Sequence, residues 1–292
     1  MAWPPVIHAA ALSLSRQTLD YAGGRAISAE SGYSVKPALP AGGPPVEYGV
    51  VKFDHLTHWV PDLDTAMRDY QALGFTVRRA GQHPRFGLHN AGWRLDTRYI
   101  ELIAVRDEAV ARAGLGPGWP EIDATLRAGG GVEGFAVLVA DIPATVADLR
   151  SRGIPVSDPQ PGSIQRTNGS VGVWQRATLP DGPRWAPIFI NYGRPIDEWA
   201  ARFRDKGYPK DPWVLQGVTV EVPDPPACAG WLAGIFGLDA ARIGQDVAQV
   251  PLPGCAITFT PGSADRITAV VLNGLGAPRG SVAGLCYRDT GS

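Results

Sequence analysis

The chain has 292 residues, of which 45% are hydrophobic and 19% are charged, a composition typical of a soluble globular protein with a sizeable core. Its 27 basic and 28 acidic side chains give a formal net charge of -1, which argues against a dedicated nucleic-acid surface because such a surface needs a basic excess. No apolar run approaches the roughly 20 residues that span a bilayer, so a membrane protein is not expected.

The first 49 residues differ in composition from the rest of the chain. Residues 23–45 are rich in Gly, Ala, Pro and Ser and show no sustained helix or strand period, which predicts a poorly structured extension over residues 1–49. The beginning lacks the basic region of a secretory signal. The three cysteines, Cys228, Cys255 and Cys286, are odd in number and far apart. We therefore expect a cytoplasmic protein with reduced thiols, a disulfide between two of them being the alternative.

After residue 50 the chain repeats one pattern three times. An apolar run leads to an aspartate, then to a helical stretch, and then to a glycine that opens another apolar run. The aspartate and glycine of each copy are Asp62 and Gly74, Asp141 and Gly153, and Asp224 and Gly237. Aspartate is favoured as a helix N-cap and glycine just after a last helical turn, so the pattern predicts a helix in each copy.

Strand signals follow each predicted helix. They cover residues 75–79, 89–95 and 99–105 in the first copy, 172–179 and 187–192 in the second, and 249–252, 256–260 and 267–272 in the third. The sequence therefore predicts an α+β protein of about three tandem strand–helix–strand–strand–strand modules. We place them at residues 50–128, 129–210 and 211–292, the last one incomplete or divergent.

Four of the five histidines lie between residues 55 and 89. They are His55, His58, His83 and His89, and Glu101 follows in the same module. No other stretch concentrates groups that bind a metal or move a proton near neutral pH. The first module is therefore the predicted place of any chemistry.

Side-chain alternation separates the histidines of the first strand, because successive residues of a strand face opposite sides. Over residues 53–60, the face with Asp54, Leu56 and Val60 is predicted to pack under the helix. His58 shares that face and is expected to be a structural histidine. His55 shares the other face with Phe53 and Trp59 and is expected to line a concave surface.

Glu101 is the single carboxylate in the apolar strand predicted at residues 99–105. A buried glutamate costs several kcal/mol unless it is paired, hydrogen-bonded or bound to a metal. A functional role is therefore one interpretation of Glu101. The alternative is a structural ion pair with Arg94 or Arg98, or a strand edge open to solvent.

The first module resembles the glyoxalase-like branch of the vicinal oxygen chelate superfamily, which includes glyoxalases, bleomycin resistance proteins and dioxygenases. The resemblance covers residues 52–105 well, the later modules only by pattern, and residues 1–47 not at all. It is carried by Asp54-His55-Leu56, Val60-Pro61-Asp62-Leu63, Ala72-Leu73-Gly74-Phe75, His83, Gly87, Asn90 and Tyr99-Ile100-Glu101-Leu102-Ile103.

The resemblance implies βαβββ modules that pair so that curved sheets enclose a cavity. In metal-using members, the first and fourth strands of a module supply a histidine or glutamine and a glutamate or histidine, and His55 and Glu101 match these places. A divalent ion such as Zn, Mn, Fe or Ni suits such ligands. His89 is the best candidate for a third ligand, a turn histidine bonded to backbone being the alternative. We expect substrate contacts from His83, His89, Asn90, Trp59, Tyr99 and Asn191.

The second module departs from the metal-using pattern. Alignment with the first module puts Gly134 opposite His55 and Asn191 opposite Glu101. Glycine offers no side chain and asparagine is a weak neutral ligand, so a four-ligand site is not supported.

We therefore predict a small-molecule enzyme with isomerase, lyase or dioxygenase chemistry, in which Glu101 acts as the base if no metal binds. The alternative is a protein that binds or sequesters a small molecule without catalysis. A homodimer is a further expectation, because the divergent third module leaves a sheet to complete.

Overall fold

The computed structural model describes residues 51–94, 98–195, 198 and 211–290. The chain divides into two compact units, Met1–Ser34 and Val35–Ser292, and every described residue belongs to the second unit. The extension predicted at residues 1–49 lies outside the described residues. None of the described helices is long and apolar enough to cross a membrane.

The first repeat of the fold, β1 to β4, follows the predicted strand–helix–strand–strand–strand order. Its elements are β1 (Lys52–Trp59), α1 (Leu63–Ala72), β2 (Val77–His83), β3 (Leu88–Arg94) and β4 (Tyr99–Val105), and a short 3₁₀ turn η1 (Pro84–Phe86) joins β2 to β3. Strand β4 pairs with β1 in parallel and with β3 antiparallel, and β3 pairs with β2.

The second repeat, β5 to β8, has the same order and the same pairing. It contains β5 (Gly131–Leu138), α4 (Ile142–Ser151), β6 (Gln160–Arg166), β7 (Val171–Ala177) and β8 (Pro187–Asn191). Strand β5 pairs antiparallel with β1, and β6 pairs antiparallel with β2. The eight strands therefore form a closed mixed sheet, in the order β1-β4-β3-β2-β6-β7-β8-β5 and back to β1.

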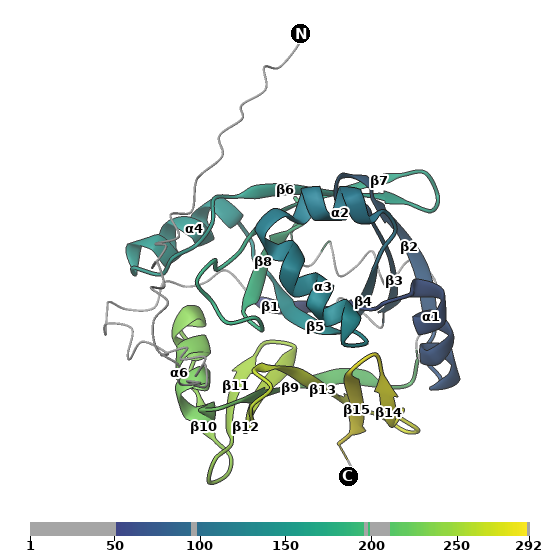
Figure 1. The fold of residues 1–292 in the computed structure, drawn as a ribbon. Helices are drawn as coiled ribbons and strands as arrows, with labels where there is room; N and C mark the ends of the chain where they lie inside the picture. Colours follow the sequence, from purple (N-terminus) through teal and green to yellow (C-terminus); the bar gives the residue numbers. More distant parts are fainter. Residues whose placement is uncertain (1–50, 95–97, 196–197, 199–210, 291–292) are drawn as a thin grey trace, which may run out of the picture. The chain divides into compact units, whose positions relative to one another are not determined.

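Helices α2 (Glu108–Leu115) and α3 (Trp119–Arg127), joined by η2 (Gly116–Gly118), connect the two repeats. They lie across the closed sheet in Figure 1. Trp59, Leu88 and Ile103 of the sheet form one buried cluster with Ala111 and Trp119 of these helices. The interior of the closed sheet is therefore covered by apolar side chains on this side.

The remaining strands extend the sheet from β13. The elements are β9 (Val214–Val222), α6 (Pro225–Phe236), β10 (Ala241–Arg242), β11 (Ala248–Leu252), β12 (Cys255–Pro261), β13 (Arg266–Asn273), β14 (Gly280–Val282) and β15 (Leu285–Asp289). The strand predicted at residues 267–272 exists as β13, but β12 is the strand that pairs in parallel with β9. Strands β10, β14 and β15 were not predicted and add to the pattern.

The three predicted helices are confirmed together with their caps. Asp62, Asp141 and Asp224 are the N-caps of α1, α4 and α6, and each carboxylate accepts a backbone N–H of the first turn. The glycines that follow the helices, Gly74, Gly153 and Gly237, all have positive φ angles. The predicted α+β class is confirmed as well.

One part of the alternation predicted for β1 is wrong. The register between β1 and β5 shifts between Phe53 and His55, which marks a β-bulge. Phe53 consequently turns away from the His55 side and stacks on Phe135, at 6.0 Å between ring centroids. The structural role predicted for His58 is confirmed, because its Nδ1 lies 2.7 Å from the Tyr70 hydroxyl of α1.

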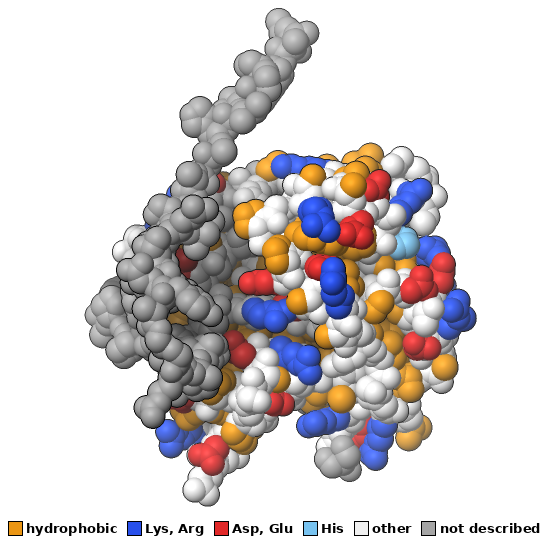
Figure 2. Space-filling model, in the orientation of Figure 1, with side chains coloured by type: hydrophobic (Ala, Val, Ile, Leu, Met, Phe, Trp, Pro, Cys, Tyr) orange, Lys and Arg blue, Asp and Glu red, His pale blue; other side chains and the backbone are white. Residues whose placement is uncertain are grey.

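The surface carries both signs of charge. Figure 2 shows Lys and Arg side chains interspersed with Asp and Glu on the visible face, without a region of one sign. This agrees with the formal net charge of -1.

Candidate functional site

A cavity of ≈ 830 Å³ lies inside the closed sheet. Strands of both repeats line it with their inward side chains. From the first repeat come His55, Thr57, Trp59, His83, Leu88, Asn90, Tyr99, Glu101 and Ile103, and from the second come Glu133, Ala136, Ile164, Trp174, Arg176, Ile188 and Ile190. Polar groups able to move a proton are therefore concentrated on the wall built by the first repeat.

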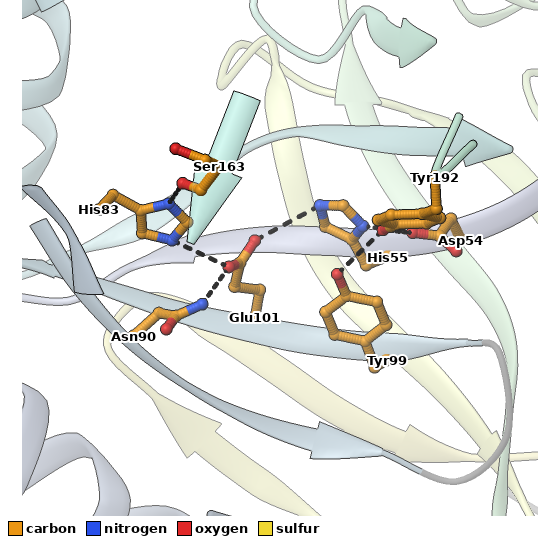
Figure 3. Close-up of polar contacts among 8 residues, drawn as sticks. All are labelled: Asp54, His55, His83, Asn90, Tyr99, Glu101, Ser163 and Tyr192. Atoms are coloured by element: carbon orange, nitrogen blue, oxygen red, sulfur yellow. Dashed lines mark hydrogen bonds and ion pairs between the residues drawn. The ribbon is translucent and has the colours of Figure 1, made fainter. Parts of the chain in front are cut away.

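Glu101 occupies the centre of this wall (Figure 3). Its Oε2 lies 3.5 Å from Nε2 of His55, and its Oε1 lies 3.7 Å from Nε2 of His83. The side-chain amide of Asn90, on the neighbouring strand β3, donates a hydrogen bond to Oε1. Strands β1, β2 and β3 thus bring three predicted residues to the carboxylate of Glu101 on β4.

The imidazole of His55 is held from behind by Asp54. Its Nδ1 lies 2.7 Å from Oδ2 of Asp54, and the Tyr192 hydroxyl donates to the same oxygen at 2.6 Å. The ring of Tyr99 stacks on the imidazole at 4.6 Å between centroids. A carboxylate only accepts hydrogen bonds, so Nδ1 carries a proton and Nε2 is presented to Glu101.

His83 is anchored in the same way, but by the second repeat. Its Nδ1 donates to the backbone carbonyl of Ser163 on β6 at 3.2 Å. The Trp174 ring lies nearly perpendicular to the imidazole, at 5.8 Å between centroids. His83 is 8% exposed, and its Nε2 is buried without a hydrogen-bond partner. An unsatisfied buried nitrogen that faces a cavity is available to a ligand or to a proton.

The electrostatics keep Glu101 ionised. Burial raises the pKa of Glu101, but the contacts with His83, His55 and Asn90 outweigh burial and lower that pKa from 4.5 to about 2. A neutral imidazole would direct the lone pair of Nε2 at this anion. Each imidazole contact with this carboxylate is therefore attractive when Nε2 carries a proton.

Within the described residues, the ion contacts of Glu101 are with His55 and His83, and the open strand edge considered as an alternative is wrong. The side chain is 13% exposed and lies in the cavity wall, not at an edge open to solvent. The guanidinium of Arg98 donates to the backbone carbonyls of Leu215 and Gly254.

Two predicted substrate-contact residues, His89 and Asn191, lie outside the cavity lining. His89 is adjacent to Asn90 on β3 and so faces the opposite side of the sheet. Burial lowers the pKa of His89, and Arg79 and Arg106 lower it further. The cavity lining includes the other four predicted contact residues, which are His83, Asn90, Trp59 and Tyr99.

Asn191 holds backbone instead of facing the cavity. Its amide donates to the carbonyls of Val139 and Ala140 at 2.7 and 2.9 Å, and its Oδ1 accepts the N–H of Gly193 at 2.7 Å. The next residue, Tyr192, is the one that lines the cavity.

Sequence reasoning missed Asp54, Tyr192 and Ser163. The adjacency of Asp54 and His55 was a usable signal, because a carboxylate often orients a functional imidazole. Tyr192 and the Ser163 carbonyl gave no comparable signal, since both come from the second repeat and reach the cluster only after the sheet closes.

The metal set that the resemblance implies is not completed by these residues. Among the described residues, no group of three or more His, Cys, Asp or Glu side chains is arranged to hold a metal. The Nε2 atoms of His55 and His83 approach different oxygens of Glu101, from opposite sides of the carboxylate in Figure 3. His55 and Glu101 alone make two ligands, fewer than the three protein ligands of a typical catalytic zinc site.

Asp54→Asn tests the orientation of His55. An asparagine offers an amide N–H or a weaker acceptor to Nδ1, so we expect a change of imidazole tautomer in ¹⁵N NMR spectra of the histidine rings. We also expect a loss of roughly 1–3 kcal/mol in unfolding free energy, because a buried charge-assisted hydrogen bond is weakened. Asp62→Asn is the matched control, since asparagine caps a helix as well as aspartate does. Unchanged His55 resonances in Asp54→Asn would contradict the assignment.

Comparison with known proteins identifies the class. The sequence profile described as a glyoxalase-like domain matches residues 53–236, which is more than half of the chain. The chain therefore belongs to the glyoxalase-like domain family, and the predicted resemblance to the vicinal oxygen chelate superfamily is confirmed. No curated protein matches the chain significantly.

Solved structures share the fold. A hypothetical protein from Staphylococcus aureus aligns over 82% of this chain and 99% of its own, with 18% identity and a TM-score of 0.72. The Mn(II)-bound glyoxalase from Novosphingobium aromaticivorans covers 78% of this chain and 67% of its own, with 14% identity and a TM-score of 0.46. Methylmalonyl-CoA epimerase from Mycobacterium tuberculosis covers 51% and 94%, with 20% identity and a TM-score of 0.37. The first of these likenesses establishes the fold, and the other two carry no conclusion about activity.

Proposed function

We propose that the cavity is the active site of a small-molecule enzyme of the vicinal oxygen chelate type, and that Glu101 transfers a proton of the substrate. One observation carries the proposal. An ionised carboxylate in the wall of a cavity faces Nε2 of two imidazoles, each of which is fixed through Nδ1 by another acceptor.

The chemistry that suits this cluster is proton abstraction next to a carbonyl group. Glu101 accepts the proton from carbon, and the electron pair moves onto the carbonyl oxygen as an enolate. His55 protonated at Nε2 stabilises that oxygen, and Asp54 stabilises the imidazolium. Return of the proton to the same or a neighbouring carbon gives an isomerase, and expulsion of a leaving group gives a lyase.

The low resting pKa of Glu101 is compatible with this role. The contacts that lower it are those with His83, His55 and Asn90. A substrate that enters between Glu101 and the imidazoles takes over part of these contacts. The pKa of Glu101 then rises, because burial alone raises it, and the carboxylate becomes a stronger base when the substrate is bound.

The divalent metal expected from the resemblance is not part of the proposed proton transfer. A divalent ion at this place would be held by His55 and Glu101 and would polarise substrate oxygens. Since these two ligands do not make a complete set, the roles above are assigned to protein groups alone. We expect elemental analysis of protein purified without chelators to find less than one transition metal per chain, unchanged in Glu101→Gln. About one metal per chain, lost in both His55→Ala and Glu101→Ala, would contradict this assignment and support the metal-dependent reaction.

Solvent isotope exchange tests the proposed reaction without knowledge of the product. The protein is incubated in D₂O with 2-oxo acids, 2-hydroxy ketones and acyl thioesters, and ¹H NMR follows loss of the proton next to the carbonyl. We expect enzyme-dependent exchange with at least one class. Exchange with none of them, in protein with native near-UV circular dichroism, would contradict the proposal.

A binding protein without catalysis is the second candidate, and the cavity wall of the second repeat favours it. On β5 and β8 this wall presents the apolar residues Ala136, Ile188 and Ile190. A sequestering protein would bind apolar ligands with an affinity that His55→Ala leaves unchanged, and it would show no isotope exchange.

A further inference from the structure

Arg176 is a cation in the cavity wall that the proposed proton transfer does not use. It lies on β7, is half-buried, and lines the cavity. Its guanidinium carbon lies 5.7 Å from the centroid of the Phe86 ring. Within the described part of the chain its side chain has the Phe86 contact and no hydrogen bond or ion pair. Burial lowers the pKa of Arg176, and the nearby Arg85 lowers it further.

The carboxylates of the cavity are engaged by other residues. Glu133 is bound by Arg184, at 3.1 Å between Arg184 Nε and Glu133 Oε2, and by the hydroxyl of Thr125. Glu101 is held by Asn90 and the two imidazoles. Neither glutamate neutralises Arg176.

The cavity lining as a whole contains more arginines than carboxylates. The lining contains five arginines and these two glutamates, and one of the arginines, Arg79, forms an ion pair with Asp64 outside the lining. The arginines are Arg78, Arg79, Arg166, Arg176 and Arg194. A cavity with an excess of one sign and walls of low polarity concentrates ligands of the opposite sign.

We propose that Arg176 is the binding residue for an oxyanion of the ligand, a carboxylate or a phosphate group. A guanidinium presents a planar fork of N–H donors that matches such oxygens, and stacking on Phe86 holds the fork in place before the ligand arrives. A half-buried cation without a counter-charge gains more from an anion than an exposed one does. This inference rests on the proposed function, because it assumes that the substrate enters the cavity, and it narrows the substrate class to acids and phosphorylated compounds.

Matched aromatic probes test the oxyanion site. Calorimetry compares 1-naphthoate and 1-naphthyl phosphate with the uncharged 1-naphthamide, on wild type, Arg176→Met and Arg176→Lys. We expect wild type to bind at least one anion about tenfold more tightly than the amide, because a charge-assisted pair discriminates by that order. Arg176→Met is expected to remove the preference and to leave amide binding unchanged. Arg176→Lys, which keeps the charge, retains part of the preference.

Arg242→Met is the control, because Arg242 is an exposed arginine on β10 outside the cavity. It is expected to bind all three probes like wild type. Equal binding of the three probes by wild type would overturn the proposal. An equal loss for all three probes in Arg176→Met would also overturn it, since that result indicates packing alone. The anion that wild type binds more tightly shows whether a carboxylate or a phosphate is the preferred group.

The binding assay separates this inference from the proposed reaction. Glu101→Gln should keep the preference for anions, since Arg176 is unchanged. A preference that depends on Arg176 without any isotope exchange would support the oxyanion site and contradict proton transfer. Isotope exchange without a preference for anions would support proton transfer and contradict the oxyanion site.

Discussion

Replacing Glu101 by glutamine is expected to lower the rate of isotope exchange by about 10²- to 10⁴-fold, the usual range for a positioned general base. The amide has the shape of the carboxylate but does not accept a proton from carbon. The variant should fold, because the amide oxygen still accepts the hydrogen bond from Asn90. The measurement is the exchange rate at saturating substrate, together with near-UV circular dichroism.

Glu133→Gln is the matched control for this prediction. Glu133 also lines the cavity, so the substitution changes the cavity charge by the same amount, but its carboxylate is engaged by Arg184 and faces no imidazole. We expect a far smaller loss of rate. Similar losses in the two variants would indicate that the cavity charge, and not proton transfer by Glu101, controls the rate. Glu101→Asp, which keeps a shorter base, should retain part of the activity.

The parts of the site that the sequence predicted depend on local rules. The N-cap at Asp62 and the glycine after α1 define the helix, and the helix defines which face of β1 is buried. Alternation along single strands then brings His55 and Glu101 to the same wall, as their contact confirms. Each of these steps needs information from one strand and its neighbouring helix.

The parts that could not be predicted depend on closure of the sheet. The bond from His83 to the Ser163 carbonyl exists because β2 pairs with β6, and the bond from Tyr192 to Asp54 spans the two repeats as well. No local pattern gives the register between strands of different repeats. The bulge in β1 also changes the side to which Asp54 points, and alternation alone placed that carboxylate with the helix-facing residues.

Acid should destabilise the fold through His58, which lies in a buried chain of hydrogen bonds. Its Nε2 donates to the Ala283 carbonyl at 2.9 Å, and its Nδ1 accepts the hydroxyl of Tyr70 at 2.7 Å. The Tyr70 oxygen in turn accepts the hydroxyl of Tyr287 on β15. This chain requires a neutral imidazole, because protonation of Nδ1 displaces the Tyr70 hydroxyl. It joins β1 and α1 to the β14–β15 turn.

The pKa values give the direction and the range of the effect. Burial lowers the pKa of His58 from 6.5 to about 4, and the Ala283 hydrogen bond opposes burial only in part. Between these two pH values the unfolded chain binds the proton more readily than the folded chain does. The unfolding free energy therefore falls as the pH decreases from 6.5 towards 4, by about 3 kcal/mol in total. Glu101 affects stability only at lower pH. The stabilisation that its lowered pKa provides is lost below pH 4.5.

Urea denaturation at a series of pH values between 7 and 4.5 measures this dependence. In wild type we expect the midpoint to fall steadily below pH 6.5. His58→Gln should unfold more easily at pH 7, because the buried chain of hydrogen bonds is disturbed, but its midpoint should change much less with pH. His89→Gln is the control, because His89 is only half-buried and its substitution should leave most of the dependence in place. An equally steep pH dependence in His58→Gln would show that another group, and not the neutral imidazole between α1 and β15, makes the fold acid-sensitive.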